Sequence, residues 1–599
     1  MKSPLIDQTT SLVSYKVTIA GTQVKEEYQI SDIEVETNLN KLPIAKVCIL
    51  DGSPYEQKMQ VMDDNNWKPG DEIKIELGYH QKLTPVFEGI VSSVGYGSTS
   101  NEHGKTIIIA TDKCVGLTLT KDNEYFEKKK DSEIAKQILQ TYDIKCDPDE
   151  TSTVHDKIVQ YNASDWDFLL SRAKSCERVV IAEFNEYFFV KPGSGGKPVK
   201  LTYGDDIIDF NLEVDAKTQR KKIEVKGWDA STHQFKQASS SEPTLDKQGS
   251  SDVKGPKLAE SLKLDKETLY LPTALDTKEL KDIANSKLLH SRLARTRGKI
   301  TMQGIADLRI DSYIQMDKVH DYYKGEMYVT GIRHIVEQGN FLTEAIIGLD
   351  EHSFDPEHTE GSTPDNMGLM PAPRGLFIGT VSKMSGDPAN DFRIQVKIPS
   401  FKEDDDGLWA KLSGPSASED SGFIWYPEVG DQVIVGFLMN DPRFPVILGS
   451  LYSKTHSAFN DHKPADGNNQ KAIVTRSHMK LLFEEDKKDI TLTTPGNNYL
   501  KISDDERSIT LEDQHGNKIV MDSSGILIDS PKTITVNAGQ KIDMDAVSSF
   551  TAKGSKIELK GKSGNALLEA TANAKVKGQT ADVRATGITN IKGSLVKLN

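Results

Sequence analysis

The sequence contains few of the residues that would indicate disulfides, membrane spans or nucleic-acid binding. Four of its 599 residues are cysteine, all within the first 176 positions and without a short paired spacing, so we expect reduced thiols buried in protein cores. No stretch approaches the ~18 uninterrupted apolar residues of a membrane span. The segment Met1–Gln8 has no apolar core, which predicts synthesis in the cytoplasm without a signal peptide. The formal net charge of −15 argues against nucleic-acid binding, which requires a basic surface.

Sequence motifs for cofactors and metals are missing as well. Neither G-x-x-x-x-G-K-[ST] nor G-x-G-x-x-G occurs, so no phosphate-binding loop is expected. The acidic run Glu403–Asp406 lacks the alternating spacing and distal glutamate of a calcium loop. His352 and His358 have no cysteine and no third histidine close to them in the sequence. We therefore predict no metal-binding or cofactor-binding residues.

Three residues deserve comparison with catalytic groups. His334 follows Arg333 in an alternating strand pattern, which favours a structural role. Asp165 and Asp167 have the pairing of a glycosidase, but they also fit the first turn of a helix, where carboxylates are stabilised by the helix dipole. The sequence therefore predicts no catalytic residue.

What the sequence does contain is a short repeat at its C-terminal end. Apolar residues recur there in pairs separated by one position, which is the period of a β-strand with one buried face. The first members of the first eight pairs are spaced by 9, 10, 9, 10, 7, 8 and 8 residues, with turn-forming residues between them. The pairs are Leu481/Phe483, Ile490/Leu492, Leu500/Ile502, Ile509/Leu511, Ile519/Met521, Ile526/Ile528, Ile534/Val536, Ile542/Met544 and Ile557/Leu559.

A repeat this short cannot enclose a core by itself, so each strand must stack on neighbouring strands or on other copies of the chain. Two arrangements remain open: intertwined chains, or a monomeric solenoid with three consecutive strands in each coil. Both are stiff β-prisms. Small residues increase towards the end, as at Ala570, Ala572 and Ala574, which predicts a tapering shaft.

The preceding residues read as globular domains. Residues 12–120 are rich in strand patterns, and helices are expected at 131–142, capped by Asp131 or Ser132, at 164–177, capped by Ser164, and at 277–294. A polar loop is expected at 229–256. A segment rich in proline and glycine follows, and residues 375–453 then contain five strand patterns, which fits a small OB-fold barrel.

Three segments have distinctive sequences. Residues 425–452 begin WYPEVGDQVIVGF and end NDPRFPVILGSLY, residues 162–172 read NASDWDFLLSR, and residues 328–334 read YVTGIRH. These segments, and the order of the predicted domains along the chain, resemble the VgrG family, which comprises the spike proteins of type VI secretion systems and of extracellular phage-tail-like contractile injection systems. The resemblance covers nearly the whole chain.

The resemblance implies a mainly β fold with some α-helix. It consists of a phage tail-hub-like region at 1–355 with two β-rich subdomains and helices, a linker at 356–374, an OB-fold domain at 375–453, a second linker at 454–472 and a trimeric β-helix needle, or β-prism, at 473–599. The second linker is too short to hold the lysozyme domain of the phage cell-puncturing protein.

The resemblance also implies a non-enzymatic function at the tip of a contractile tube. The expected partners are two further copies in a homotrimer, the inner tube protein, baseplate proteins, a PAAR-repeat tip protein and effector cargo, with transient contact with a target membrane. The chain would be incorporated into the particle and then translocated into a target cell or released. Docking of the tip protein is expected at Ser594, Leu595, Val596, Lys597, Leu598 and Asn599.

One alternative from another class remains open, an enzymatic tailspike that binds and cleaves a surface polysaccharide. Such an enzyme needs paired carboxylates and exposed aromatic residues on its prism. The tail has only Phe483, Tyr499 and Phe550 as aromatic residues. A fused effector domain is not expected, because the repeat runs nearly to residue 599.

Overall fold

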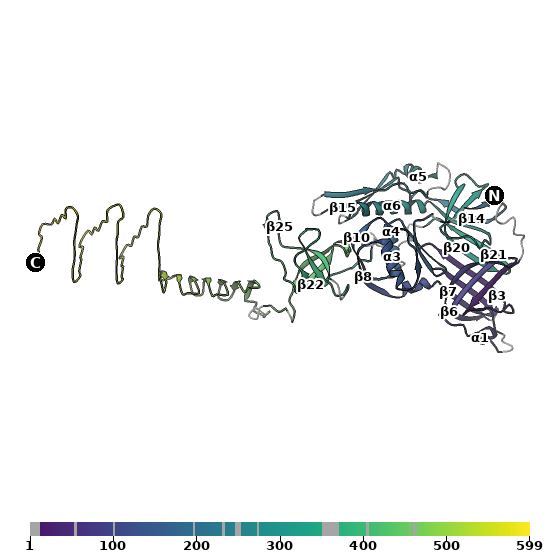
Figure 1. Ribbon diagram of the computed structural model, residues 1–599, viewed down its shortest axis with the longest axis horizontal. Coiled ribbons are helices and arrows are strands. Elements are labelled where there is room, and N and C mark those ends of the chain that lie inside the picture. Colours follow the sequence, from purple (N-terminus) through teal and green to yellow (C-terminus); the bar gives the residue numbers. More distant parts are fainter. Residues whose placement is uncertain are drawn as a thin grey trace. The chain divides into compact units, whose positions relative to one another are not determined.

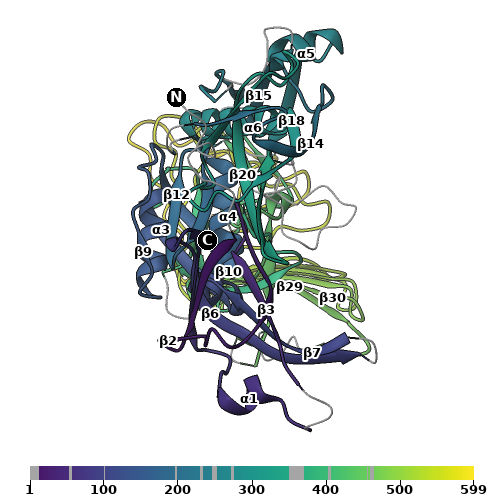
Figure 2. The same cartoon turned by 90° about the vertical axis from the view of Figure 1, so that its right-hand side faces the viewer.

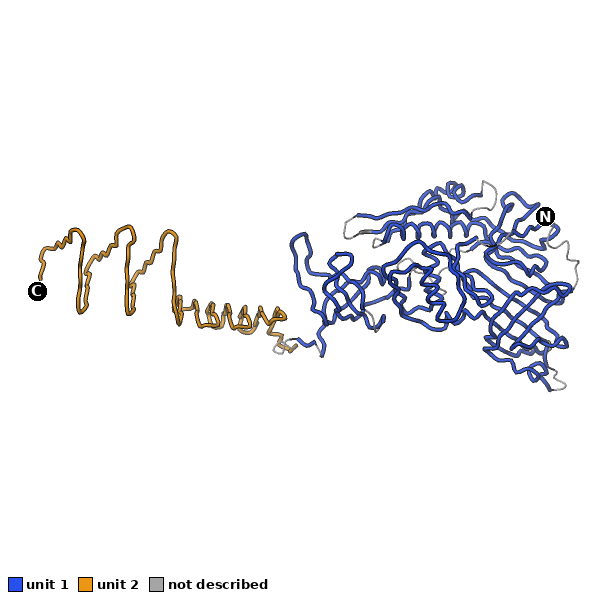
Figure 3. Tube along the Cα trace, viewed as in Figure 1, with its two compact units in different colours: residues 1–458 blue, residues 459–599 orange. Residues whose placement is uncertain are grey.

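One large sheet forms the framework of the N-terminal region in the computed structural model (Figure 1). The structure describes residues 12–52, 57–99, 102–193, 195, 198–229, 234–245, 253–271, 275–349, 370–402, 406–454, 456–458 and 464–598. The chain divides into two units, residues 1–458 and 459–599 (Figure 3). The first unit contains every helix of the described residues.

The large sheet combines strands from two distant parts of the sequence. Its main path runs β14-β18-β21-β20-β3-β4-β7-β6-β5-β1-β2, and β19 pairs with both β20 and β13. The two parts meet where Gly331–Glu337 pairs antiparallel with Asp32–Asn38. The strands are β1 (Val13–Ile19), β2 (Thr22–Gln23), β3 (Ile30–Asn38), β4 (Ile44–Leu50), β5 (Glu72–Tyr79), β6 (Lys82–Thr99), β7 (Glu102–Thr111), β13 (Val199–Thr202), β14 (Ile207–Val214), β18 (Thr296–Gln303), β19 (Tyr313–Asp317), β20 (Gly325–Glu337) and β21 (Asn340–Ile347).

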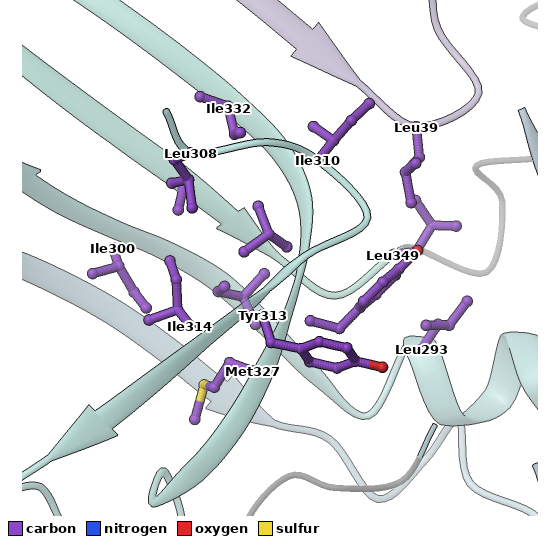
Figure 4. Close-up of a cluster of buried hydrophobic side chains, with 14 of the residues drawn as sticks. Leu39, Leu293, Ile300, Leu308, Ile310, Tyr313, Ile314, Met327, Ile332 and Leu349 are labelled. Atoms are coloured by element: carbon purple, nitrogen blue, oxygen red, sulfur yellow. The ribbon is translucent and has the colours of Figure 1, made fainter. Parts of the chain in front are cut away.

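Alternating side chains of this sheet fill two hydrophobic cores, as period-two patterning requires. One core forms around β1, β4 and β5, with Val47, Ile75 and Leu77 fully buried. The other lies against β18–β21 and includes Leu39, Tyr313 and Leu349 (Figure 4). The predicted strand-rich region at 12–120 is therefore confirmed.

Two helices pack against smaller sheets to form a third core. Helix α3 (Asp131–Gln140) and helix α4 (Asp165–Ser175) bury Ile134, Leu139 and Phe168. Ser164 caps α4 as predicted, because its side chain accepts a hydrogen bond from the Asp167 backbone N–H at 3.1 Å. The predicted caps of α3 are wrong: Lys130 is its N-cap, and Asp131 and Ser132 lie buried inside the first turn. The sheets are β8 (Lys121–Lys130) with β10 (Val154–Ser164), and β11 (Val179–Glu183) with β12 (Glu186–Val190) and β9 (Lys145–Cys146).

Helix α6 (Thr277–Leu293) packs on the small sheet formed by β15–β17, as both views show (Figures 1 and 2). The sheet contains β15 (Lys222–Asp229), β16 (Gln234–Ser239) and β17 (Lys266–Leu271). Strand β16 falls in the stretch 229–256 that was predicted as a polar loop, so that prediction is wrong there, and helix α5 (Gly255–Ser261) begins at its end. Strand β16 was missed because its side chains are polar and mostly exposed, and its pairing with β15 holds it in place. The unit also contains two short helices, α1 (Gln60–Asp64) and α2 (Gly116–Leu119).

Five strands form a closed barrel in the order β22-β23-β24-β28-β27. They are β22 (Phe377–Lys383), β23 (Arg393–Lys397), β24 (Leu408–Leu412), β27 (Gln432–Phe437) and β28 (Pro445–Leu451). Val396, Val433 and Ile447 fill its centre. The predicted five-stranded barrel and the mainly β fold are confirmed.

The four cysteines are free. Burial raises the pKa of Cys48 to about 11 and that of Cys146 to about 12, and it raises the pKa of Cys114 and Cys176 as well. These thiols are therefore neutral near pH 7 and unreactive, in agreement with the prediction of reduced core cysteines.

Candidate functional site

Seven five-residue strands of the C-terminal unit pair in chain order to form an antiparallel sheet. They are β29 (Gln470–Val474), β30 (Lys480–Glu484), β31 (Asp489–Thr493), β32 (Tyr499–Ser503), β33 (Ser508–Glu512), β34 (Lys518–Asp522) and β35 (Gly525–Asp529). Each strand pairs with the next one along the chain, whereas a solenoid with three strands per coil would pair each strand with the third one after it. The monomeric solenoid is therefore excluded for residues 470–529.

The turn lengths account for the spacing of the repeat. Four-residue turns at 485–488 and 504–507 alternate with five-residue turns at 494–498 and 513–517. Added to five-residue strands, these turns give the alternating steps of 9 and 10 residues seen in the sequence. The next turn is only Ser523–Ser524, and it produces the step of 7 residues. The spacing of the apolar pairs thus reports the hairpin geometry directly.

The apolar pairs align into two straight columns on one face of the sheet. Directly paired residues of neighbouring antiparallel strands lie on the same face. One column is Ile473, Leu481, Leu492, Leu500, Leu511, Ile519 and Ile528, and the other is Phe483, Ile490, Ile502, Ile509, Met521 and Ile526. Between the two columns, on the opposite face, lie Thr491, Lys501 and Thr510.

The single chain does not cover this apolar face. Most of the column residues are exposed, from 37% for Leu500 to 70% for Ile526. Burying one such side chain fully contributes about 1.5–3 kcal/mol. A contiguous apolar face of this extent marks an interaction surface, because monomeric proteins rarely leave one uncovered.

Beyond β35 the chain forms neither strand nor helix within the described residues 530–598. The apolar pairs Ile534/Val536, Ile542/Met544 and Ile557/Leu559 are all exposed there. In Figure 1 this part of the chain runs in wide open excursions. The strands predicted for this stretch therefore do not form from one chain alone.

The predicted tip-docking residues Ser594, Leu595, Val596, Lys597 and Leu598 are all exposed, and Asn599 lies outside the described residues. Leu595 is 73% and Leu598 is 88% exposed.

A second candidate site is the junction between the barrel and the helical part of the first unit, where aromatic rings meet. Phe401 of the barrel lies 4.4 Å from Tyr161 of β10, centroid to centroid, and 5.3 Å from Phe437. Phe377 contacts both Tyr161 and Phe401 edge-on. The barrel core thus extends onto β10, which fixes the barrel to that strand.

Beside the aromatic rings lies a network of buried charges. Arg443, in the loop between β27 and β28, pairs with Glu279 of α6 at 2.5 Å and with Asp441 at 2.8 Å. Burial opposes ionisation of Glu279, but the charges of Arg443 and His155 outweigh it and hold the pKa of Glu279 at about 2. Burial likewise lowers the pKa of Arg443, and Asp441 and Glu279 raise it above its usual range. Both groups are therefore charged at neutral pH.

The network continues into α3 and α4. Asp131 accepts hydrogen bonds from Arg172 Nε at 2.6 Å and from His155 Nε2 at 2.9 Å. Burial opposes the charge on Asp131, while Arg172 and His155 hold its pKa well below the usual range. For His155, burial lowers the pKa, but the hydrogen bonds to Asp131 and Glu279 raise it overall.

Sequence reasoning missed this network. Asp131 was interpreted as a helix cap, and Arg443 entered only as part of a barrel motif. The members come from positions 131 to 443 and share no local pattern, so only the tertiary fold brings them together.

The other residues considered as candidates have structural partners. Asp165 accepts hydrogen bonds from Tyr142 and Gln160, and Asp167 accepts one from Ser164. Of the acidic run, only Asp406 lies within the described residues, and it is exposed. His352 and His358 lie outside them. The described ranges contain no group of three or more His, Cys, Asp or Glu side chains placed to hold a metal ion.

His334 lies buried in β20, with Nδ1 3.0 Å from Thr343 Oγ1. Burial, reinforced by Arg309, lowers its pKa to about 3. Above about pH 6.5, the usual histidine value, both folded and unfolded states are neutral. As the pH falls from 6.5 to 3, only the unfolded state takes up the proton, so the free energy of unfolding decreases by about 1.4 kcal/mol per pH unit from this group.

We therefore expect His334→Gln to make the stability of the N-terminal unit less dependent on pH between 6.5 and 4. Urea titrations at several pH values measure this difference. An equally steep pH dependence in both chains would contradict the assignment of a neutral His334.

Comparison with protein families identifies the chain. The Alg8 N-terminal domain family matches residues 9–338, which is more than half of the 599 residues. The chain belongs to this family. The type VI secretion system/phage-baseplate injector OB domain matches residues 377–452, and the phage baseplate V C-terminal trimerisation domain matches residues 489–565. The OB-domain match coincides with the closed barrel, and the trimerisation-domain match covers β31–β35 of the tail sheet and the chain beyond them as far as residue 565.

Curated relatives agree with these matches. The type VI secretion system spike protein VgrG3 of Vibrio cholerae is 29% identical over 121 residues, which cover 18% of this chain and 12% of the relative. The actin cross-linking toxin VgrG1 of the same species is 29% identical over 143 residues, which cover 22% of this chain and 13% of the relative. The chain thus matches only about an eighth of the length of each relative. Together with the matches to the OB and trimerisation domains, these relatives support a VgrG-type spike.

The fold is shared with a solved structure. A chain of the lidded Francisella PdpA–VgrG complex superposes with a TM-score of 0.52 at 13% identity, covering 88% of this chain and 81% of that chain. At this identity the likeness concerns the fold alone. Within the described residues, no helix has the length and hydropathy needed to cross a membrane.

Proposed function

We propose that this chain is a structural spike that forms a homotrimer at the tip of a contractile injection system. It joins the inner tube and baseplate to a membrane-piercing needle, and it carries a PAAR-repeat tip protein and effectors. The proposal rests on one observation: the two apolar columns of residues 473–528 stay uncovered in a single chain, and their part from Ile490 onwards lies in the segment 489–565 that matches a trimerisation domain.

A trimer accounts for both parts of the tail. Three copies of the seven-stranded sheet can turn their apolar faces towards a common axis and bury the columns. After β35 the described residues 530–598 form no strand within one chain, and their exposed apolar pairs would find strand partners on the other copies. In such a shaft, stability and assembly are inseparable.

The junction between the barrel and α6 supports a load-bearing role. A needle transmits axial force only if the domains behind it are fixed to one another. Here the barrel is held by an aromatic cluster and by the Arg443–Glu279 ion pair. We propose the functional division already expected from the sequence, with a tail hub at 1–355, an OB-fold domain at 375–453 and a needle at 473–599, separated by linkers at 356–374 and 454–472.

We propose that the chain itself is not an enzyme, and that toxic activity enters the target with bound effectors. On the polar face of the tail sheet, the neighbouring carboxylates Glu484 and Asp489 form ion pairs with Lys487 and Lys501, which is the arrangement of a structural surface. We propose further that the chain leaves the producing cell only as part of the particle, translocated into a target or released with it.

Imaging tests the proposed function. Particles purified from the producing cells, with this chain labelled by a bound antibody fragment, are expected to show the label at one end of sheathed tubes. Label found on free trimers only, in cells that contain assembled tubes, would contradict the proposal.

Deleting residues 590–599 is expected to abolish co-purification of the PAAR-repeat tip protein, because exposed Leu595 and Leu598 lie in the deleted segment. We expect the bound fraction to fall at least about tenfold, which corresponds to about 1.4 kcal/mol. The mass of the truncated assembly in light scattering serves as the control and should remain that of a trimer. Undiminished binding would refute docking at this end.

A further inference from the structure

A long arm of the barrel has no cover in the single chain. Residues 413–426 connect β24 towards β27, and all of them are exposed. The arm contains the short hairpin of β25 (Ala417–Ser418) and β26 (Ser421–Gly422), and Figure 1 shows the segment with β25 standing off from the barrel. A two-stranded hairpin of this size is not stable in water by itself.

The returning half of the arm is strongly apolar. Phe423, Ile424 and Trp425 are 51%, 77% and 47% exposed, and the rings of Phe423 and Trp425 stack with centroids 6.1 Å apart. Gly422 makes this geometry possible, because at its φ of +144° a Cβ would lie 2.7 Å from the Ser416 carbonyl oxygen. Stacked aromatic side chains on an exposed arm are typical anchors for a protein partner.

The barrel carries a second, separate apolar patch on its outer wall. Leu376 and Ile378 are 66% and 57% exposed on β22 and the residue before it, and Leu448 on β28 is 51% exposed. Gly436 lies beneath Leu376 and Leu448, since a Cβ on it would meet their methyl carbons at 3.4 and 3.5 Å. The register places Ile434 beside Ile378, so the patch spans β22, β27 and β28.

We propose that the arm of one copy packs its Phe423–Trp425 segment onto the Leu376–Ile378–Leu448 patch of the next copy. A ring of three identical subunits is built from heterologous contacts, in which one surface of each subunit meets a different surface of its neighbour. One domain here presents two different apolar surfaces, and its own arm leaves its own patch open. Repeated three times, the contact closes into a ring and leaves neither surface exposed.

This inference rests on the proposed trimer and adds the contact that joins its barrels. Residues 452–469 separate the last barrel strand from the tail sheet, a span of no more than roughly 60 Å when fully extended. Three tails wound together therefore hold three barrels within reach of each other. Such tethering raises the effective concentration to about the millimolar range, where a modest apolar contact becomes populated.

Photo-cross-linking of the full chain tests the contact without assuming a register. The chain carries p-benzoyl-phenylalanine in place of Trp425 and is refolded with an equal amount of heavy-nitrogen-labelled chain. Irradiation is expected to give mixed-isotope cross-links between the arm of one copy and residues 376–378 or 446–450 of another. Cross-links that lie within one copy, or that fall outside the barrel wall, would overturn the inference.

A second measurement uses chains with substitutions in the apolar patch of the barrel wall and an unchanged C-terminal tail. Leu376→Asp with Leu448→Asp is expected to reduce the intermolecular cross-link yield at least about tenfold, whereas Phe392→Ser, at an exposed aromatic outside both surfaces, is expected to leave it unchanged. Light scattering separates the two proposals. If the chain is a trimer but the barrel substitutions do not reduce its intermolecular cross-link yield, the arm contact alone is refuted. If the unaltered chain is a monomer, the trimer is refuted together with the arm contact.

Discussion

A chain carrying Ile509→Asp and Leu511→Asp is expected to be monomeric at micromolar concentrations at which the unaltered chain is a trimer. Both residues lie on β33, one in each apolar column, and they are 41% and 51% exposed in the single chain. In the trimer they face the axis, so each substitution removes about 1.5–3 kcal/mol of burial per copy and adds a carboxylate whose desolvation costs several kcal/mol. Three copies bring six such carboxylates together. The summed free-energy cost of these six substitutions exceeds the free energy of unfolding of a typical domain.

The matched control lies between the two positions. Thr510→Asp introduces a carboxylate on the same strand but on the opposite, polar face, so the trimer should persist. Size-exclusion chromatography with light scattering measures the mass of all three chains. If the double variant remained trimeric, or if Thr510→Asp dissociated the trimer as completely, the apolar columns would not be the trimer interface.

Arg443→Met is expected to lower the free energy of unfolding of the N-terminal unit by about 3–5 kcal/mol near neutral pH. The substitution removes the cation that pairs with Glu279 at 2.5 Å and with Asp441 at 2.8 Å, and both carboxylates are buried. Breaking a buried pair from one side leaves charges without compensation and has this magnitude in other proteins. Urea titration followed by tryptophan fluorescence measures the change. Lys411→Met on the same barrel is the control, since it breaks an ion pair with Asp391 in which the lysine is exposed, and it should cost no more than about 1 kcal/mol.

The stabilisation that the Glu279–Arg443 ion pair provides is expected to depend on pH. The pKa of Glu279 is about 2 in the fold, below the value of about 4.3 in an unfolded chain. Its ion pairing therefore stabilises the fold above about pH 4.3, and this contribution is lost as the pH falls towards 2. The stability difference between the unaltered chain and Arg443→Met should be largest above about pH 5 and should shrink on acidification. A difference that stays constant down to pH 3 would mean that Glu279 is not stabilised by Arg443.

Much of the architecture could be predicted because its signals are local. The five strands of the barrel were expected within residues 375–453, where they lie, since hydrophobic runs and turn residues alternate there over short distances. The cap of α4 by Ser164 followed from the same kind of local chemistry. Strand β16 was missed because its polar sequence carries no such signal, and its pairing with β15 decides its conformation.

Some features of the functional surfaces also follow from local sequence, and others only from the tertiary structure. The sequence by itself determined the two-residue period and the spacing of the tail repeat, because alternating side chains and fixed turn lengths are properties of a local stretch of chain. Only the tertiary structure decided that consecutive strands pair antiparallel, that the apolar pairs align into columns, and that the barrel arm and the barrel wall are two separate surfaces. It also brought Asp131, Glu279 and Arg443 into one buried network. Register, exposure and contacts between distant residues depend on how the whole chain closes, and no short segment contains that information.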